Sequence, residues 1–333
     1  MRARTASEIT RKRAPTVLEF AEGWLEREVK PNRRATTYRS YKGILDNHIL
    51  PTLGAMRINR LEPADVERCI AIVRTTSTAS MASKSRTVLH RIMARAVALE
   101  IASRNPVTPV AVPRVDKRPM AFLDSEQLTK LFAAAEGDRF EALPIVLATA
   151  GLRIGEALAL TWNDVDLNER LLSVTKTAQE GDGVIKVVQP KTAAGRRVVA
   201  IGAAAAKALR KRHRLAEREK LAAPENIVFP TETGTHMRLS NLHRRWWSPL
   251  LAKAQLERIR LHDLRHSSAS LSLLAGTSAK VVAEKLGHTN PGFTLRTYSH
   301  SVESLARVDA DAIDHLIRPR SRKAALRKSP ARN

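Results

Sequence analysis

Aromatic residues are scarce in this chain of 333 residues, where Phe, Trp and Tyr together make up 4% of the sequence. Hydrophobic residues still make up 43%, so any core must be built mainly from Ala, Leu, Val and Ile. Strands favour aromatic and β-branched residues, whereas helices pack well with Ala and Leu. The composition therefore favours closely packed helices over a β-sandwich, and the length suggests about two domains.

Cysteine is nearly absent, since Cys69 is the only one in the chain. One cysteine excludes an internal disulfide and a zinc site built from several cysteines. Its neighbours Ile70, Ile72 and Val73 are apolar, which predicts a small buried residue rather than a reactive thiol. No apolar run approaches the roughly 18 residues of a membrane span, and no signal-peptide core follows the basic start. We expect a cytoplasmic chain without a membrane partner.

Acidic residues are too few to balance the basic ones. Lys and Arg number 57 against 33 Asp and Glu, which gives a formal net charge of +24. Such an excess predicts a polyanionic partner, and nucleic acid is the first candidate. Charge alone leaves open a basic surface that serves solubility or meets a membrane.

Prolines and charged runs divide the chain into five segments. Four prolines interleaved with basic residues cannot continue a helix and mark an extended linker between two domains. Both ends of the chain are basic and polar, and we expect the last one to be disordered. The predicted segments are a basic arm (1–14), a helical module (15–104), the linker (105–119), a second domain (120–317) and a basic tail (318–333).

The helical module is predicted from apolar residues at spacings of three and four. Pro31 breaks the first helix, and a turn is expected over 51–54. The predicted helices begin at Thr16, span 35–48, begin at Pro63 and span 83–99.

The second domain starts with helical patterns and then changes its period. Three short β-like runs, 171–175, 184–188 and 197–201, are separated by glycine-containing turns and predict a three-stranded antiparallel meander. The fold class is therefore mainly α with a small antiparallel β-meander. The helices predicted after the meander span 203–221, 241–254, 262–275, 278–286 and 302–317.

Two segments near the meander carry candidate functional residues. Arg153 and Glu156 lie three apart after Gly151, so they share one helical face. Lys191, in the sequence Pro-Lys-Thr, lies on the predicted turn between the second and third strands, where it could reach into a groove. Each signal is weak alone, since surface ion pairs and basic hairpin tips are common.

Two later segments add histidines, an arginine and a tyrosine. His262 and Arg265 lie three apart at a predicted helix start and can face one target together. His288 follows a Leu-Gly pair, and Tyr298 comes ten positions later. An isolated histidine or tyrosine usually serves packing, so these residues too gain meaning only as a set.

In chain order the set is Arg153, Lys191, His262, Arg265, His288 and Tyr298. This order, with the residues around each, resembles the tyrosine recombinase family, also called the phage integrases. The resemblance extends from about Thr16 to Ile317. In the helical module it rests on Thr37-Tyr38, His48-Ile49-Leu50-Pro51, Leu53-Gly54 and Asn105-Pro106.

The resemblance implies a helical core DNA-binding domain at 15–104 and a mixed α/β catalytic domain at 120–317. It implies an enzyme that cuts and rejoins DNA at specific sites through a 3′-phosphotyrosyl intermediate, and so integrates and excises a phage, prophage or other mobile element. No metal or other cofactor is implied. The implied roles are nucleophile for Tyr298, phosphate binding for Arg153 and Arg265, leaving-group acid for Lys191, general base for His262, phosphate binding for His288 and arginine orientation for Glu156.

The resemblance also implies partners. These are double-stranded DNA with attachment-type sites and three further copies of the chain, forming a tetramer in which helix 302–317 packs on a neighbour. A host DNA-bending protein and an excision factor are further candidates, and the expected location is the nucleoid of a bacterial host. The predicted DNA contacts are Arg33, Arg34, Arg39, Lys84, Arg86, Arg114, Lys117, Arg118 and Arg196.

One departure from the lambda-like integrases concerns the start of the chain. Those proteins carry an arm-binding domain before the core-binding module, whereas only the arm 1–14 precedes it here. A segment this short cannot fold as a domain. Either the chain acts at simple sites or the start of the protein lies further upstream.

Three alternatives remain open. A type IB topoisomerase shares the catalytic set, but the core-binding module favours a recombinase. A chromosome-dimer resolvase or a transposon recombinase of the same family is a closer alternative than a topoisomerase. The Pro-Lys-Thr sequence around Lys191 favours an integrase. A DNA-binding protein without catalysis is a different class, and the argument against it is that all six positions are filled by competent residue types.

Overall fold

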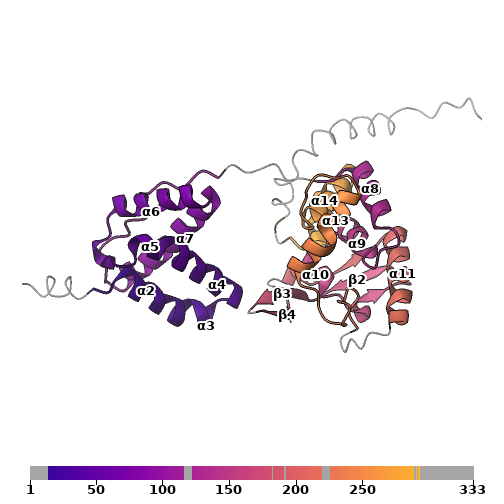
Figure 1. The fold of residues 1–333 in the computed structure, drawn as a ribbon, viewed down its shortest axis with the longest axis horizontal. Coiled ribbons are helices and arrows are strands. Elements are labelled where there is room, and N and C mark those ends of the chain that lie inside the picture. The colour runs from indigo at the N-terminus through magenta and orange to yellow at the C-terminus, as the bar shows by residue number, and fades with distance from the viewer. Residues whose placement is uncertain are drawn as a thin grey trace, which may run out of the picture. The chain divides into compact units, whose positions relative to one another are not determined.

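The computed structural model describes residues 14–115, 122–181, 183–190, 193–219, 226–288, 290 and 292. The chain divides into two compact units (Figure 1), up to Arg118 and from Pro119 onward. Each unit has its own hydrophobic core. No helix in the described ranges combines the length and apolar character of a membrane span. Outside the described residues lie most of the predicted arm, Lys117, Arg118, Lys191, Tyr298, helix 302–317 and the tail.

The first unit is all-helical in its described part, as predicted. Its first helix begins at the predicted N-cap: Glu19 N–H donates to Thr16 Oγ1 at 3.1 Å, and Thr16 N–H donates to the Glu19 carboxylate at 2.7 Å. The segments are α2 (Val17–Trp24), η1 (Leu25–Val29), α3 (Lys30–Asn32), α4 (Ala35–Ile44), η2 (Leu45–Ile49), α5 (Leu50–Leu53), η3 (Ile58–Arg60), α6 (Pro63–Thr76) and α7 (Ala79–Ala98).

The predicted turn at 51–54 is wrong, because the chain stays helical through Pro51 to Leu53. A proline ring clashes with the carbonyl four residues earlier in an α-helix. The π-helical segment η2 widens the turn just before Pro51, and the Leu50 N–H donates to the Leu45 carbonyl. The extra residue per turn relieves the clash, so the helix continues.

The helical core extends into the predicted linker. Val107 and Val110 are buried against the first unit, and Arg86 donates to their carbonyls at 3.1 and 2.7 Å. Asn105 Nδ2 donates to the His90 carbonyl at 3.0 Å. Proline excludes a helix here but does not prevent packing, and the two valines supply apolar side chains. Residues 105–110 therefore belong to the first unit rather than to an extended tether.

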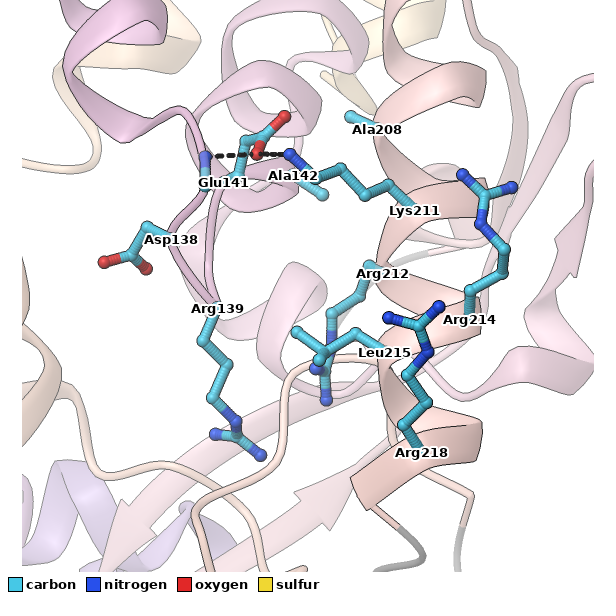
Figure 2. A pocket seen from close by; sticks show the side chains of 11 residues that line it. Asp138, Arg139, Glu141, Ala142, Ala208, Lys211, Arg212, Arg214, Leu215 and Arg218 are labelled. Carbon is cyan, nitrogen blue, oxygen red and sulfur yellow. Dashed lines mark hydrogen bonds and ion pairs between the residues drawn. The ribbon is translucent and has the colours of Figure 1, made fainter.

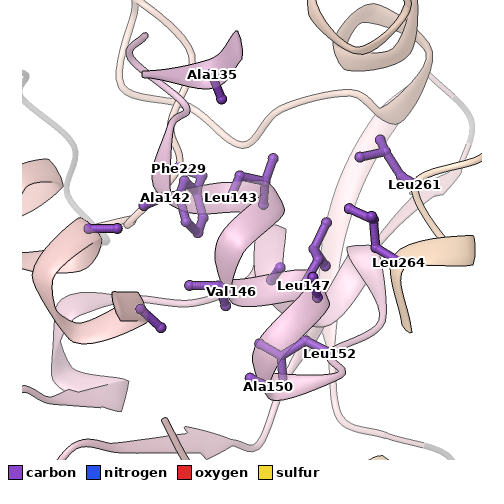
Figure 3. Packing of buried hydrophobic residues seen from close by; sticks show 14 of the residues in the cluster. Ala135, Ala142, Leu143, Val146, Leu147, Ala150, Leu152, Phe229, Leu261 and Leu264 are labelled. Carbon is purple, nitrogen blue, oxygen red and sulfur yellow. The ribbon is translucent and has the colours of Figure 1, made fainter. Parts of the chain in front are cut away.

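The second unit surrounds α9 (Ala142–Ala150), which is buried on nearly every side and packs against α11 and α14. Its Leu143, Val146 and Leu147 meet Phe229 and Leu264 in the core that Figure 3 shows. The other helical segments are α8 (Ser125–Ala135), α10 (Ile154–Leu158), η4 (Trp162–Asp164), η5 (Ala193–Gly195), α11 (Ala203–Glu219), α12 (Leu239–Leu242), η6 (His243–Trp247), α13 (Ser248–Lys253), α14 (Asp263–Leu274) and α15 (Ala279–Leu286).

The fold class is confirmed, but the predicted pairing of the strands needs correction. β2 lies between β1 and β5 in an antiparallel sheet, while β3 and β4 form a separate hairpin in which Thr177 faces Val188. Gly183 supplies the positive φ, 73°, of a two-residue hairpin turn. β3 was missed because Thr-Ala-Gln-Glu-Gly shows no apolar alternation. The strands are β1 (Val165–Asp166), β2 (Leu171–Val174), β3 (Thr177–Gly181), β4 (Val184–Val188) and β5 (Arg197–Ala200).

Candidate active site

The junction between α9 and α10 presents Arg153. α9 ends at Gly151, whose φ of 66° is left-handed, and Arg153 is the N-cap of α10. The Arg153 backbone N–H and Nη1 donate to the two Glu156 carboxylate oxygens at 2.9 and 2.7 Å. The Arg153 side chain is 41% exposed and that of Glu156 2% exposed. The guanidinium is thus held from inside the protein and open to solvent.

Burial alone would raise the pKa of Glu156. Hydrogen bonds and charge from Arg197, followed by those from Arg153, outweigh burial and hold the pKa below its ordinary value. Glu156 is therefore ionised at neutral pH and orients both arginines.

Arg265 ties the same junction to the end of α15. It lies in the first turn of α14 and is 2% exposed. Its Nη1 donates to the Gly151 carbonyl at 2.6 Å, and its Nη2 donates to the Leu286 carbonyl. A Cβ on Gly151 would lie 2.8 Å from Leu286 Cδ2, so the junction and α15 are in close contact.

The end of α15 presents His288. Gly287 caps the helix with a left-handed φ of 67°, and the His288 N–H donates to the Ala283 carbonyl at 2.9 Å. Burial, followed by the charges of Arg265 and Arg153, lowers the pKa of His288 to about 4. The two predicted arginines therefore lie close enough to His288 to change its charge state.

His262 joins this group from the N-terminus of α14. His262 is an exposed residue, yet partial desolvation of its ring, followed by the charges of His266 and Arg265, lowers its pKa to about 4. The rings of His262 and His266 meet edge to face at 5.2 Å. Both catalytic histidine candidates are therefore neutral at physiological pH and can accept a proton.

Four of the six predicted catalytic residues are thus brought together: Arg153, His262, Arg265 and His288. Lys191 and Tyr298 lie outside the described residues, and their roles stay predictions. The chain on either side of Lys191 is described, and Ala194 lies against Gly287, where a Cβ would come within 2.6 Å of the Ala194 carbonyl.

Arg197 is a site residue that sequence reasoning missed. It starts β5, its side chain is 7% exposed, and it donates to both Glu156 oxygens at 2.9 and 3.2 Å. The predicted DNA contact was its exposed neighbour Arg196. Adjacent side chains of an extended chain point to opposite sides, so the sequence alone does not show which of the two arginines faces inward.

The predicted DNA contacts differ in how they are held. Arg33, Lys84, Arg114 and Arg196 are exposed, while Arg34 and Arg39 are partly buried at the start of α4. Arg86 instead uses its guanidinium to bind backbone carbonyls of 107–110. Its predicted DNA contact therefore competes with a bond inside the first unit.

A separate cavity of about 370 Å³ lies between the start of α9 and α11 and is rich in arginine (Figure 2). Lys211 pairs with Glu141 there at 2.5 Å, and Arg139 and Arg212 both pair with Glu219. Burial would raise the pKa of Glu219, but the two arginines lower it to about 2. None of the four described catalytic candidates lines this cavity, and carboxylates already pair with three of its cations.

Within the described ranges, no group of three or more His, Cys, Asp or Glu side chains is placed to hold a metal ion. The described cluster brings together Arg153, Arg197 and Arg265 with two neutral histidines, with Glu156 beside the arginines and Asp263 beside His262. Such a cluster attracts an anion, and planar guanidinium groups match the geometry of phosphate oxygens.

Family models match both units. The model described as the Phage integrase family matches residues 121–304, and the model of the phage integrase N-terminal SAM-like domain matches residues 16–71. The first match includes all six predicted catalytic positions, and the second covers helices α2 to α5.

Curated relatives align over most of the chain. The prophage phiRv2 integrase of Mycobacterium tuberculosis is 30% identical over 306 residues, which cover 90% of this chain and 78% of that protein. The ICEBs1 integrase of Bacillus subtilis is 27% identical over 320 residues, covering 91% and 83%.

Solved structures share the fold. The Tn1549 transposon integrase in complex with a circular intermediate DNA matches with a TM-score of 0.77 at 20% identity, covering 90% of this chain and 100% of that chain. A lambda integrase tetramer bound to a Holliday junction matches with a TM-score of 0.67 at 16% identity, covering 89% and 80%.

Proposed function

Because the chain belongs to the phage integrase family and is a site-specific tyrosine recombinase, we propose that Tyr298 is its nucleophile. The phenolic oxygen attacks a DNA phosphodiester, forms a phosphotyrosyl bond at the 3′ end and displaces a 5′ hydroxyl. The reverse attack by a 5′ hydroxyl on that bond rejoins the strand without ATP. The observation that carries this proposal is the convergence of Arg153, Arg265, His262 and His288.

Arg153 and Arg265 are suited to the non-bridging phosphate oxygens. Charge accumulates on these oxygens during transfer, and a preorganised donor typically contributes on the order of 10²–10³ in rate. Glu156 fixes Arg153, while backbone carbonyls at the ends of α9 and α15 fix Arg265. Arg153, which is 41% exposed, needs no reorganisation to bind a phosphate, whereas Arg265, which is 2% exposed and bonded to backbone carbonyls, must exchange one of those bonds for a phosphate oxygen.

His262 is suited to accept the phenolic proton. A phenol has an ordinary pKa of about 10 and must lose its proton as it attacks. Burial and the neighbouring cations lower the pKa of His262 to about 4 in the absence of DNA, which keeps the ring neutral but weakens it as a base, while Asp263 acts in the opposite direction. The negative charge of a bound phosphate would raise this pKa toward the range that suits a general base. His288, held by the turn at Gly287, would then bind a phosphate oxygen.

Lys191 is proposed to protonate the departing 5′ oxygen. It lies between β4 and η5, and η5 lies against the turn that precedes His288. Desolvation among cations lowers the pKa of an amine toward neutrality, which suits a general acid. The arginines supply the positive charge that a metal supplies at other phosphoryl-transfer centres, so we propose a reaction without metal or other cofactor.

Double-stranded DNA with attachment-type sites is the proposed substrate. The solved structures that share the fold include integrases bound to DNA as dimers and as a tetramer. We propose that this chain also acts as a tetramer, with the described exposed cations on phosphates. From the sequence alone, we also propose a host DNA-bending protein and an excision factor as partners. The proposed location is the nucleoid of a bacterial host.

Integration of a prophage or another mobile element is the favoured biological role. Relatives that align over about nine tenths of this chain are named as integrases of a prophage and of ICEBs1. A chromosome-dimer resolvase or a transposon recombinase is the second candidate, since a relative named as XerC-like is 26% identical over 313 residues.

A covalent-adduct assay tests the proposal. The parent chain and Tyr298→Phe are incubated in EDTA with a nicked suicide substrate that carries a candidate attachment site. We expect a protein–DNA adduct for the parent and none for Tyr298→Phe, with specific binding nearly unchanged. Tyr38→Phe is the matched control, because the Tyr38 hydroxyl bonds only Glu26 among the contacts the structure gives it. An adduct that persists in Tyr298→Phe would reject the nucleophile, and an absolute need for Mg²⁺ would reject the metal-free mechanism.

A further inference from the structure

Arg197 links three parts of the candidate active site that are far apart in the sequence. We propose that it is a positioning residue, which sets the relative placement of Arg153 and His288 without touching DNA. This inference rests on the proposed function, because it concerns the geometry of that reaction.

The first link runs through Glu156. Arg197 Nη2 and Nη1 donate to its two oxygens at 2.9 and 3.2 Å, while Arg153 donates to the same two oxygens from Nη1 and its backbone N–H. A carboxylate offers about four acceptor sites, so the two arginines saturate it. The position of the Arg153 guanidinium is thereby set by where Arg197 holds the carboxylate.

The second link runs to the end of α15. Arg197 Nε donates to the Lys285 carbonyl at 2.6 Å, three residues before His288. A Cβ on the intervening Gly287 would lie 3.2 Å from Arg197 Nη1, so the turn packs directly against the guanidinium. The turn that presents His288 therefore rests on Arg197.

The third link runs to the segment that follows Lys191. Arg197 Nη1 also donates to the Gly195 carbonyl at 3.3 Å, which closes the short helix η5 onto the start of β5. With the side chain only 7% exposed, the guanidinium bonds to its own chain. Arg197 thus acts on the reaction only through the residues that it holds.

This role requires the forked shape of the Arg197 guanidinium group rather than its charge. A lysine at this position keeps one positive charge beside Glu156 but cannot reach both the carboxylate and the Lys285 carbonyl. Arg197→Lys should therefore fold, retain DNA binding and lose cleavage. Misplacement of reacting groups by about 1 Å typically costs on the order of 10²-fold in rate.

The experiment measures single-turnover adduct formation at saturating protein for the parent, Arg197→Lys, Arg197→Ala and Arg210→Ala. Arg210 is the matched control, an exposed arginine of α11 that donates to the Leu167 carbonyl. We expect a rate loss on the order of 10²-fold for both Arg197 variants, with Kd within about threefold of the parent, and parental values for Arg210→Ala. A parental rate for folded Arg197→Lys would overturn the proposal.

A second measurement separates this inference from the proposed function. The imidazole resonances of His288 are followed by NMR against pH in the parent and in Arg197→Lys, without DNA. We expect altered His288 shifts in the variant, because the turn loses its support. A parent that forms no adduct would overturn the proposed function alone, whereas unchanged His288 resonances in the variant would overturn the positioning role whether or not the parent cleaves DNA.

Discussion

At the scale of single residues, the charge state of the site follows from burial and from the balance between its cations and two carboxylates, Glu156 and Asp263. Removing one partner of a buried ion pair typically costs about 3–5 kcal/mol, because the other charge stays buried. Glu156 therefore depends on Arg153 and Arg197 as much as they depend on it. Burial, and then the surplus positive charge, opposes protonation of His262 and His288.

The lowered pKa values of the two histidines predict how the stability of the fold depends on pH. The pKa of His262 and of His288 is lowered from 6.5 to about 4 in the folded chain. Between these values the unfolded state binds more protons, so the free energy of unfolding must fall as pH falls through this window. We expect the melting temperature to decrease from pH 6.5 to pH 5, above the range in which carboxylates titrate.

The combined variant His262→Gln, His288→Gln provides the comparison for thermal melts across the same pH range. Its melting temperature should depend less on pH than that of the parent. An equally steep dependence would show that the two histidines are not held neutral by the fold.

Lys191 can be tested as the leaving-group acid by changing the leaving group. Replacing the bridging 5′ oxygen with sulfur gives a thiolate, which departs without protonation. Lys191→Ala should lose about 10²–10⁴-fold in cleavage of normal DNA and recover most of it on the sulfur substrate. Arg153→Ala should not recover, because its proposed work is on the non-bridging oxygens.

Single-turnover cleavage of both substrates by both variants measures this difference. Equal defects of Lys191→Ala on the two substrates, together with a raised Kd, would leave Lys191 as a DNA anchor. The acid would then have to be His262 or a water molecule.

At the scale of elements, prolines show what sequence alone could and could not predict. Pro31, Pro51 and Pro249 each come two residues after a π-helical segment, at η1, η2 and η6. Each time the widened turn lets the chain stay helical past the proline. Apolar periodicity located the helices, but a π-helical turn depends on packing around it and left no signal in the sequence.

Prediction of the strands and of the site from sequence was limited for a similar reason. That Arg153, His262, Arg265 and His288 meet was predicted from their resemblance to the catalytic set of the tyrosine recombinases. Arg197 could not be separated from Arg196, because the inward-facing residue depends on the register of β5 against β2. β3 escaped detection because its pairing with β4, rather than its own composition, makes it a strand.

The packing of α10 against β3 provides a test at this scale. An alanine is favoured over glycine by about 1 kcal/mol inside a helix. At Gly155, however, a Cβ would lie 2.7 Å from Thr177 Oγ1 and 2.8 Å from the Ala178 carbonyl. The backbone atom cannot be avoided by a rotamer change, and overpacking of this kind costs about 1–3 kcal/mol. Gly155→Ala should therefore lower stability and slow cleavage, because the hairpin leading to Lys191 must move.

Gly43→Ala is the control for this substitution. It lies inside α4, and the nearest atom to an added Cβ is Asn47 Nδ2 at 3.9 Å. Urea unfolding should show a gain of up to about 1 kcal/mol for Gly43→Ala, the helix-propensity term without a clash. A gain for Gly155→Ala as well would mean that α10 and β3 are not in fixed contact.

At the scale of the whole molecule, the net charge of +24 and the division into two units shape how DNA is bound. Each unit has a separate apolar core, so each can present its cations on a rigid surface. Phosphate contacts release counterions, so affinity should fall steeply with salt, with a logarithmic slope of about −0.9 for each phosphate contacted. Replacing a single basic residue distinguishes a specific phosphate contact from a general excess of surface charge, because only the loss of a specific contact changes that slope.

Lys84 and Arg86, both predicted to contact DNA, lie two residues apart on α7 and should differ in this measurement. Lys84 is exposed, whereas Arg86 donates to the carbonyls of Val107, Thr108 and Val110. Lys84→Ala should reduce the magnitude of the salt slope by about 1 and leave thermal stability unchanged. Arg86→Ala should leave the slope nearly unchanged and lower the melting temperature, because three carbonyls of the first unit lose a charged donor. Fluorescence anisotropy titrations between about 50 and 200 mM salt, with melts of both variants, measure the two quantities. The reverse pattern would assign Arg86 to DNA and Lys84 to solvent.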